Sequence, residues 1–366
     1  MRIGLTGSNG FLAWHVRCAL WAMQEVDVVP IDRVQFESVE LMDLALAEVD
    51  AVIHLAGVNR AHEEVITSVN LDLAERLSEG LSRKQSPITV VYGNSIQSRG
   101  DSVFGISKAK AAEILRSQCE ASGSKFVDVL IPNVFGEHGH PFYNSVVATF
   151  CHQIASGAEP RIEVDRELLL VHAQDVAEIL IGAATTPEES NIEVGGKTLL
   201  VSDVLEQISA ISGPYADGQL PNLSDPFTRS LFNTYRSFTF PQKWPIHPVK
   251  HADQRGELVE AVRAAGGETQ VFFSTTKPGF TRGDHFHLRK VERFLVLEGQ
   301  ATIKLRRLFT EEIIEFQVSG DSPAIIDMPT LWTHSITNTG ERNLLTLFYA
   351  DDEYNPDDPD TYWIAV

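Results

Sequence analysis

Hydrophobic residues in the first half of the chain fall into short, almost continuous runs, separated by longer amphipathic stretches with helical spacing. Continuous apolar runs are typical of strands buried on both faces of a sheet. The alternation predicts an α/β fold: a parallel, doubly wound, Rossmann-type sheet covered by helices. We expect strands at residues 2–6, 26–31, 50–57 and 86–92, and helices at residues 15–23, 63–81 and 108–122.

The hydrophobic pattern changes in the second half. Residues 214–248 are rich in proline, asparagine, serine and aromatic residues and have no clear period, which indicates the end of a subdomain followed by a linker. Short alternating runs after residue 248 indicate a closed all-β sandwich or barrel. We therefore predict an α/β domain with a substrate subdomain at residues 1–243 and a β-barrel at residues 244–366. Its strands are expected at residues 270–274, 293–297, 301–305, 313–316, 324–328 and 344–348.

A glycine-rich turn follows the first predicted strand, between Gly7 and Ala13. Strand, glycine turn and helix in that order form the entry of a dinucleotide site, where backbone N–H groups and the helix N-terminus meet a pyrophosphate. Ala13 replaces the third glycine and is small enough for close packing of helix on strand. A purely structural turn is the alternative, but the second strand ends at Asp32, where a ribose-binding residue is expected.

The residues after that second strand leave the choice of nicotinamide cofactor open. Asp32 would accept a hydrogen bond from the 2′-hydroxyl of NAD, whereas Arg33 could pair with the 2′-phosphate of NADP. The two residues favour different cofactors, so either NAD(H) or NADP(H) is expected.

Two histidines one residue apart, His285 and His287, point to the same face of a strand, and Glu292 follows five residues later. This segment fits the first cupin motif, G-x5-H-x-H-x4-E-x6-G, at every defined position. His334 lies in a segment that resembles the second cupin motif, although Leu331 stands where glycine is usual. The four residues predict a divalent metal site in a cupin barrel. Their residue types suit zinc, iron, nickel or manganese, and we take zinc as the expected ion; ordinary barrel residues are the alternative.

The charge of the chain limits its partners. Thirty Lys and Arg against fifty Asp and Glu give a net charge of −20 and a pI near 5.0, which argues against binding nucleic acid or an anionic membrane surface. Three widely spaced cysteines form no disulfide framework, and no apolar leader precedes the first strand. We expect a cytoplasmic protein. An acidic cupin with exposed sheet edges also predicts a homodimer.

The first half resembles the extended short-chain dehydrogenase/reductase family, which uses a serine and a Tyr-x-x-x-Lys pair. Ser95 and Lys108 match this pattern, but Phe104 occupies the tyrosine position. A phenyl ring can neither donate nor accept the proton that the tyrosine exchanges with substrate. Phe104 is therefore a deliberate substitution that traps a complex, a natural loss that leaves a redox-inactive domain, or a sign that the segment is misaligned.

The same resemblance completes the expected cofactor site. The segment from Leu130 to Gly136 resembles the loop that lies beside the nicotinamide in these enzymes. The expected cofactor-binding residues are Gly7, Asn9, Gly10, Phe11, Ala13, Asp32, Arg33, Leu55, Ala56, Gly57, Lys108, Pro132 and Asn133.

Over essentially its whole length the chain resembles the bifunctional capsular polysaccharide enzymes of the CapF type. The segments that carry this resemblance, besides the metal motif, are residues 55–60, 95–97, 143–151, 276–279, 318–321 and 359–362. The resemblance implies a UDP-linked 4-keto-6-deoxy-N-acetylhexosamine as substrate, on the route to an N-acetyl-L-fucosamine precursor. In that family the cupin inverts C3 and the first domain then reduces the C4 ketone with NADPH.

That order of steps makes chemical sense, because a proton on C3 is acidic only while C4 is a carbonyl. The expected candidates for proton transfer at C3 are Lys277, His287 and Asp321. Two alternatives to the two-step enzyme stay open. Either the cupin alone is active, as a sugar-nucleotide epimerase beside a domain that only binds cofactor, or the protein is a non-enzymatic ligand sensor or scaffold.

Overall fold

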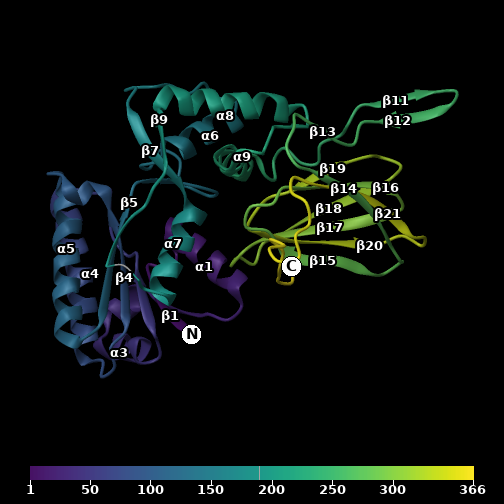
Figure 1. Ribbon diagram of the computed structural model, residues 1–366. Coiled ribbons are helices and arrows are strands. Elements are labelled where there is room, and N and C mark those ends of the chain that lie inside the picture. The colour runs from purple at the N-terminus through teal and green to yellow at the C-terminus, as the bar shows by residue number, and fades with distance from the viewer. Residues whose placement is uncertain (189) are drawn as a thin grey trace. The chain divides into compact units, whose positions relative to one another are not determined.

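A six-stranded parallel sheet lies at the centre of the first half of the chain, as the continuous apolar runs predicted (Figure 1). The strands are, in sheet order, β2 (Asp27–Ile31), β1 (Arg2–Thr6), β3 (Ala51–His54), β4 (Thr89–Ser95), β5 (Lys125–Ile131) and β8 (Asn191–Glu193). β2 and β3 lie on opposite sides of β1, so the order of the strands reverses at β1. Open α/β sheets bind ligands at such a reversal, beyond the carboxyl ends of the strands.

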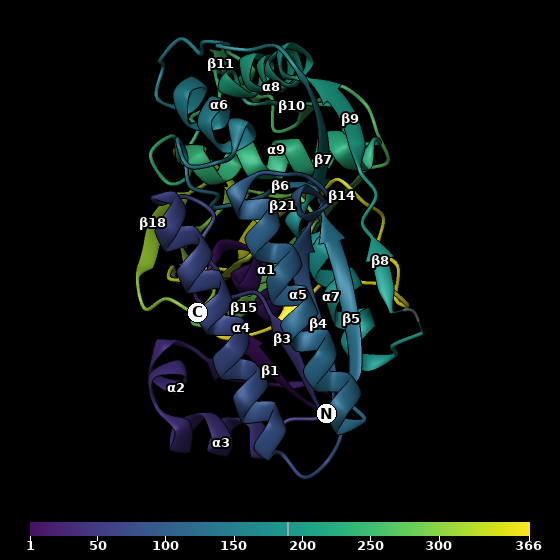
Figure 2. The ribbon, with the colours of Figure 1, turned by 90° about the vertical axis from the view of Figure 1, so that its left-hand side faces the viewer.

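Helices cover both faces of this sheet and make it doubly wound. One face packs against α1 (Phe11–Met23) and α7 (Ala173–Thr185), and its core is a cluster of buried aliphatic residues. The other face packs against α3 (Val39–Ala47), α4 (Glu63–Arg83) and α5 (Val103–Ser122). Figure 2 shows α4 and α5 side by side in front of the sheet. The short helix α2 (Arg33–Glu37) follows β2 directly.

Helix α5 begins five residues before the predicted start at residue 108. The Ser102 side chain accepts a hydrogen bond from the Gly105 N–H and caps the helix. A Cβ on Gly105 would lie 2.0 Å from the Gln97 carbonyl oxygen, so this glycine allows α5 to lie close against the turn after β4. The earlier start places Phe104 in the first turn of the helix.

The structure describes residues 1–188 and 190–366, which form two compact units. The first comprises Met1–Phe135, Phe142–Ser145 and Arg166–Leu200, and the second comprises the rest of the described chain. The first unit includes a small mixed sheet of β6 (Asn133–Phe135), β7 (Glu167–His172) and β9 (Lys197–Leu200). None of the helices in the described residues has the length and hydropathy needed to cross a bilayer.

The second unit is built around two antiparallel sheets, which confirms the predicted all-β, cupin-like architecture. One sheet has the order β18 (Ile313–Ser319), β17 (Gln300–Arg307), β20 (Trp332–Asn338), β15 (Thr281–Phe286) and β22 (Tyr362–Trp363). The other has the order β14 (Gln270–Thr276), β21 (Leu344–Ala350), β16 (Glu292–Glu298) and β19 (Ile325–Met328). Two small pairs complete the strands: β11 (Lys250–Asp253) with β12 (Gly256–Val259), and β10 (Gln219–Leu220) with β13 (Arg263–Ala264).

Three helices belong to the second unit, and one of them lies where the sequence indicated a linker. They are α6 (Val146–Ala155), α8 (Val201–Ala216) and α9 (Pro226–Thr239). Helix α9 begins with proline at its first position, and the Asp225 side chain accepts a hydrogen bond from the Thr228 N–H. The aromatic and polar composition of this stretch concealed its helical period. The predicted domain boundary after residue 243 stays a prediction.

Candidate functional site

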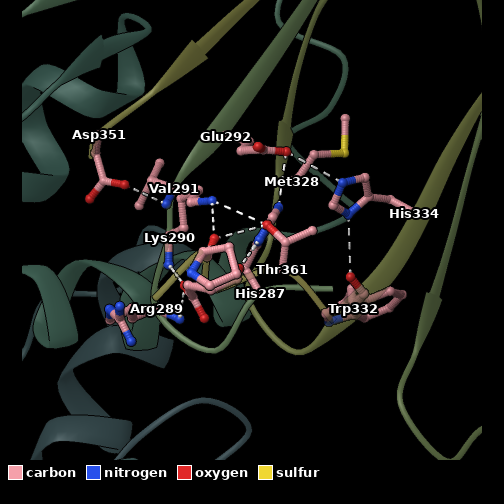
Figure 3. Close-up of polar contacts among 12 residues, drawn as sticks. His287, Arg289, Lys290, Val291, Glu292, Met328, Trp332, His334, Asp351 and Thr361 are labelled. Atoms are coloured by element: carbon pink, nitrogen blue, oxygen red, sulfur yellow. Dashed lines mark hydrogen bonds and ion pairs between the residues drawn. The ribbon is translucent and has the colours of Figure 1, made fainter. Parts of the chain in front are cut away.

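Four candidate metal ligands come together in the barrel of the second unit. His285 in β15 pairs with His334 in β20, while His287 follows the end of β15 and Glu292 begins β16. One ligand atom from each of the four residues lies within 4.8 Å of the others. The Glu292 Oε2 atom lies 3.0 Å from His287 Nε2 and 3.4 Å from His334 Nε2 (Figure 3). The spacing of the motif therefore predicted a real convergence of side chains.

The pKa values in this cluster follow from burial and from the single carboxylate. Burial, together with the neighbouring His334 and His287, lowers the pKa of His285 to about 3. Burial also lowers the pKa of His334. For His287 the effect of burial is outweighed by Glu292, so its pKa is raised. Burial would raise the pKa of Glu292, but His287 and His334 hold it well below its usual range. The cluster therefore favours an ionised Glu292 and neutral His285 and His334, which are the ligand forms that a divalent metal needs, whereas His287 would have to release the proton that Glu292 favours.

The hydrogen bonding of the cluster also fits a cation. The Nε2 atoms of His287 and His334 are buried and, among the described residues, have no well-oriented hydrogen-bond partner. Three imidazoles and one carboxylate are a common donor set for zinc and other first-row metals. A structural role alone would leave these ring nitrogens with only the poorly oriented Glu292 carboxylate as a partner, at a cost in stability. The donor set therefore fits a metal ion better than it fits an ordinary barrel core.

Only His287, of the three candidates for proton transfer, lies in this cluster. Lys277 is in the exposed turn before β15, at the opposite end of that strand from His285. Asp321 is exposed and follows β18. The last residue of β18 pairs with Gln300 in β17, whereas His334 pairs with Leu305, five residues further along β17. The structure does not bring Lys277 or Asp321 to the ligands, and their roles stay predictions.

The glycine-rich turn of the first unit lies where the sheet order reverses. Gly7 has φ +64°, and a Cβ on it would lie 3.0 Å from Ala56 Cα, so glycine permits this close approach between the turns after β1 and β3. The Thr6 hydroxyl accepts hydrogen bonds from the N–H groups of Leu55 and Ala56 and holds the second turn in place. Gly10 is the N-cap of α1. A narrow turn that leads into a helix N-terminus is the arrangement that accommodates a pyrophosphate.

The two residues after β2, Asp32 and Arg33, have different partners. Asp32 accepts hydrogen bonds from the Ser8 N–H (2.8 Å), the Ser8 hydroxyl (2.7 Å) and, more weakly, the Asn9 amide (3.4 Å). Its carboxylate is thereby fixed beside the glycine turn. The Arg33 side chain is 88% exposed and pairs with Glu37, one helical turn away, at 2.6 Å. Asp32 is therefore placed at the turn, while Arg33 is held by another partner.

The reductase-like residues lie at the end of β4 and the start of α5. Ser95 ends β4, and its hydroxyl accepts a hydrogen bond from the Gln97 N–H. Lys108 is buried, donates to the Gly93 carbonyl at 2.7 Å, and lies 4.1 Å from the centroid of the Tyr92 ring. Burial lowers the pKa of Lys108 to about 7, and Asp128 partly offsets this effect. Phe104 lies one turn before Lys108 on the same helix, as a Tyr-x-x-x-Lys spacing requires.

The remaining predicted cofactor residues lie beside these elements. Phe11 begins α1, and Ala13 is buried two residues later. Gly57 follows the turn after β3, and a Cβ added to Gly57 would lie 3.0 Å from the Asn70 Oδ1. Pro132 separates β5 from β6, and the Asn133 amide donates to the Leu169 carbonyl. The roles of these residues in cofactor binding stay predictions.

Two buried residues near the metal cluster were missed by the sequence reasoning. Asp327 in β19 forms an ion pair with Arg293 in β16, and both side chains are almost fully buried. Asp360 accepts hydrogen bonds from three successive N–H groups after His287. Neither aspartate belongs to a metal-binding motif. The signals for them were indirect: a buried, apolar strand surrounds Asp327, and Asp360 lies in the segment 359–362 that carries the family resemblance.

Two family profiles match the chain, one in each half. Residues 3–195 match the NAD dependent epimerase/dehydratase family. Residues 251–362 match the polysaccharide biosynthesis C-terminal domain. A full-length relative from Pseudomonas aeruginosa, UDP-2-acetamido-2,6-beta-L-arabino-hexul-4-ose reductase, is 32% identical and is aligned over 100% of this chain and 99% of its own.

Solved structures agree with both halves. The capsular polysaccharide assembling protein CapF from Staphylococcus aureus is 29% identical, with a TM-score of 0.63 and complete coverage of both chains. UDP-N-acetylglucosamine 4-epimerase from Bacillus cereus is 20% identical over 58% of this chain and 82% of its own, with a TM-score of 0.53, and shows the fold of the first half alone.

Proposed function

This chain belongs to the NAD dependent epimerase/dehydratase family, and we propose that it modifies a UDP-linked 4-keto-6-deoxy-N-acetylhexosamine in the synthesis of a surface polysaccharide precursor. The coarser assignment, a UDP-sugar reductase or epimerase, is supported by the full-length relative and by the two matched profiles. In our proposal the cupin epimerises C3 and the first domain supplies reduction of the C4 ketone, toward UDP-N-acetyl-L-fucosamine. The observation that carries the cupin half is the convergence of four ligands in one barrel.

The epimerisation step needs a base, a stabilised enolate and a proton from the opposite face. Removal of the C3 proton leaves an electron pair that delocalises onto the C4 carbonyl oxygen, and protonation from the other face inverts C3. A divalent metal, which we expect to be zinc, would be held by His285, His287, Glu292 and His334 and would supply Lewis-acid stabilisation of oxygen. The barrel residues buried around the cluster exclude water from its inner side.

The reduction step is impaired in this chain because Phe104 has no hydroxyl. Hydride transfer to C4 leaves an alkoxide that must receive a proton, and the tyrosine of related enzymes provides it in the family mechanism. Ser95 can still donate a hydrogen bond to the substrate oxygen. Lys108 remains buried one turn after Phe104 and can still contact the cofactor ribose. The second candidate function is therefore a cupin epimerase beside a cofactor-binding domain of low redox activity, and the observation that favours it is Phe104.

Isotope exchange in D2O separates the two chemical steps. With the UDP-4-keto-6-deoxy sugar, we expect deuterium to enter at C3 without any nicotinamide cofactor, because enolisation requires only the ketone. Mass spectrometry follows the exchange, and loss of absorbance of the reduced nicotinamide follows reduction, which we expect to be slow. No deuterium incorporation by the metal-loaded protein would refute the epimerase assignment. A tightly held nucleotide sugar without turnover would instead favour a sensor or scaffold.

Cofactor preference provides a separate prediction for the first domain. Asp32 is fixed beside the glycine turn, whereas Arg33 is paired with Glu37. A carboxylate near the ribose accepts from the 2′-hydroxyl of NADH and repels the 2′-phosphate of NADPH. We expect NADH to bind about tenfold more tightly than NADPH, a factor that corresponds to about 1.4 kcal/mol. Quenching of protein fluorescence measures both dissociation constants.

Variants at Asp32 and at the partner of Arg33 test the cofactor prediction further. Asp32→Ser should reduce the difference in affinity between NADH and NADPH, because it improves NADPH binding. The matched change Glu37→Gln removes only the partner of Arg33 and leaves the Asp32 contacts in place. Tighter binding of NADPH by the unmodified protein would contradict the role of Asp32.

A homodimer and a cytoplasmic location stay predictions of the sequence.

A further inference from the structure

A strap formed by the last ten residues of the chain lies along the strand that carries the first metal ligand. We define this strap as residues 357–366. Within it, β22 pairs with β15, so that Trp363 lies opposite His285 and Tyr362 opposite Phe286. The strap continues with an N–H donated by Ile364 to the carbonyl of Asp284. These contacts place residue 360 beside the point where the chain leaves β15 and reaches His287.

Asp360 binds the turn after His287 through its side chain. Its Oδ1 accepts from the Leu288 N–H (2.9 Å), and its Oδ2 accepts from the N–H groups of Arg289 (3.0 Å) and Lys290 (2.7 Å). Asp360 is only 2% exposed. A carboxylate that accepts from three successive backbone N–H groups fixes the path of the segment between His287 and Glu292.

The backbone of the same residue fixes the ring of His287. The His287 Nδ1 contacts the Asp360 carbonyl oxygen, and because a carbonyl can only accept, Nδ1 must carry the hydrogen. In the neutral ring Nε2, which lies 3.0 Å from Glu292 Oε2, then carries a lone pair that can bind a metal ion. Metal-bound histidines are commonly held in this way, with the second ring nitrogen donating to a carbonyl or carboxylate.

Further contacts hold Asp360 itself in place. Its φ of +41° lies in the left-handed region, which asparagine and aspartate tolerate better than most residues. On either side of it, the Lys290 ammonium donates to the Pro359 carbonyl (2.6 Å) and to the Thr361 hydroxyl (3.2 Å) (Figure 3). The strap and the turn after His287 are therefore joined by hydrogen bonds to Asp360 and to both of its neighbours.

We propose that Asp360 is a positioning residue of the metal centre, whose carbonyl sets the tautomer of His287 and whose carboxylate fixes the turn between two ligands. The inference rests on the proposed metal site of the cupin. It extends that site to the C-terminal strap, which contributes no ligand of its own. Metal affinity should therefore depend on a residue that lies 73 positions after His287 in the chain.

The test compares substitutions that tolerate the left-handed backbone. Asp360→Gly keeps the carbonyl and the backbone conformation but removes the carboxylate, and Asp360→Asn keeps the shape but replaces one acceptor oxygen with a donor. The matched control is Asp358→Asn, in the same strap, where the exposed side chain pairs with Arg289 and touches no ligand. Zinc dissociation constants are measured by competition with a chelator, and cobalt-loaded protein gives a visible spectrum that reports ligand geometry.

We expect Asp360→Gly to weaken zinc binding by about 10- to 100-fold and to shift the cobalt spectrum. Asp360→Asn should give a smaller loss of zinc affinity, and Asp358→Asn should bind zinc as tightly as the unmodified protein does. If Asp360→Gly fails to fold, the near-isosteric Asp360→Asn decides the question alone. Unchanged affinity and spectrum in the Asp360 variants would overturn the positioning role of the Asp360 carboxylate and leave the metal site intact. Absence of stoichiometric metal from the unmodified protein would instead overturn the proposed metal site.

Discussion

Phe104→Tyr should raise the rate of ketone reduction by about 10²- to 10⁴-fold, the range that a well-placed general acid contributes. The new hydroxyl would occupy the first turn of α5, one turn before Lys108 and close to the end of β4. Oxidation of the reduced nicotinamide, measured with the keto-sugar substrate under single-turnover conditions, gives the rate directly. Deuterium exchange at C3 should not change, because the cupin does not depend on residue 104.

Two further variants show whether the gain depends on position. Ile106→Tyr adds the same phenol two residues later on α5, where the side chain is 42% exposed, and should leave the rate of reduction low. Lys108→Met in the Phe104→Tyr background should remove the gain, because the buried ammonium is then missing. If the unmodified protein already reduces the ketone as fast as Phe104→Tyr, another group donates the proton and our interpretation of Phe104 is wrong.

Asp327→Ala should destabilise the second unit by about 3–5 kcal/mol, the usual cost of removing one partner of a buried ion pair. Asp327 accepts from Arg293 at 2.6 and 2.9 Å and from the Tyr215 hydroxyl at 2.8 Å. After the substitution the Arg293 guanidinium keeps only the Gly218 carbonyl as a hydrogen-bond partner among the described residues and remains buried. The free energy of unfolding is measured by urea denaturation followed by tryptophan fluorescence.

Two control variants accompany the stability prediction for Asp327→Ala. The double change Arg293→Met with Asp327→Leu removes both charges, so it should recover most of the lost stability. Glu315→Ala removes one partner of the exposed pair with Lys304, in which both side chains are more than 40% exposed, and should cost at most about 1 kcal/mol. A loss for Asp327→Ala no larger than that of Glu315→Ala would show that the buried pair is not a major source of stability.

The sequence predicted the central strands well and missed those whose pattern is polar. All six barrel strands expected from alternating apolar runs are present, within a few residues of their predicted bounds. Strand β20, which carries His334, was not among them because its sequence mixes threonine, serine and asparagine with a histidine, and these residues are buried by tertiary packing rather than by their own hydropathy. Helix α9 was missed for a related reason: its buried face includes an arginine and an asparagine that pair only in the folded unit.

What the sequence by itself determined was the local chemistry: the α/β and all-β halves, the glycine turn, the four candidate metal ligands, and the missing hydroxyl at Phe104. Periodicity and motif spacing carry this information because strands and helices repeat over a few residues. The tertiary structure decided which charges face which partners. It placed Asp32 rather than Arg33 at the glycine turn, left Lys277 and Asp321 away from the ligands, and brought Asp360 to His287. These relations depend on contacts between segments far apart in the chain, and no local pattern encodes them.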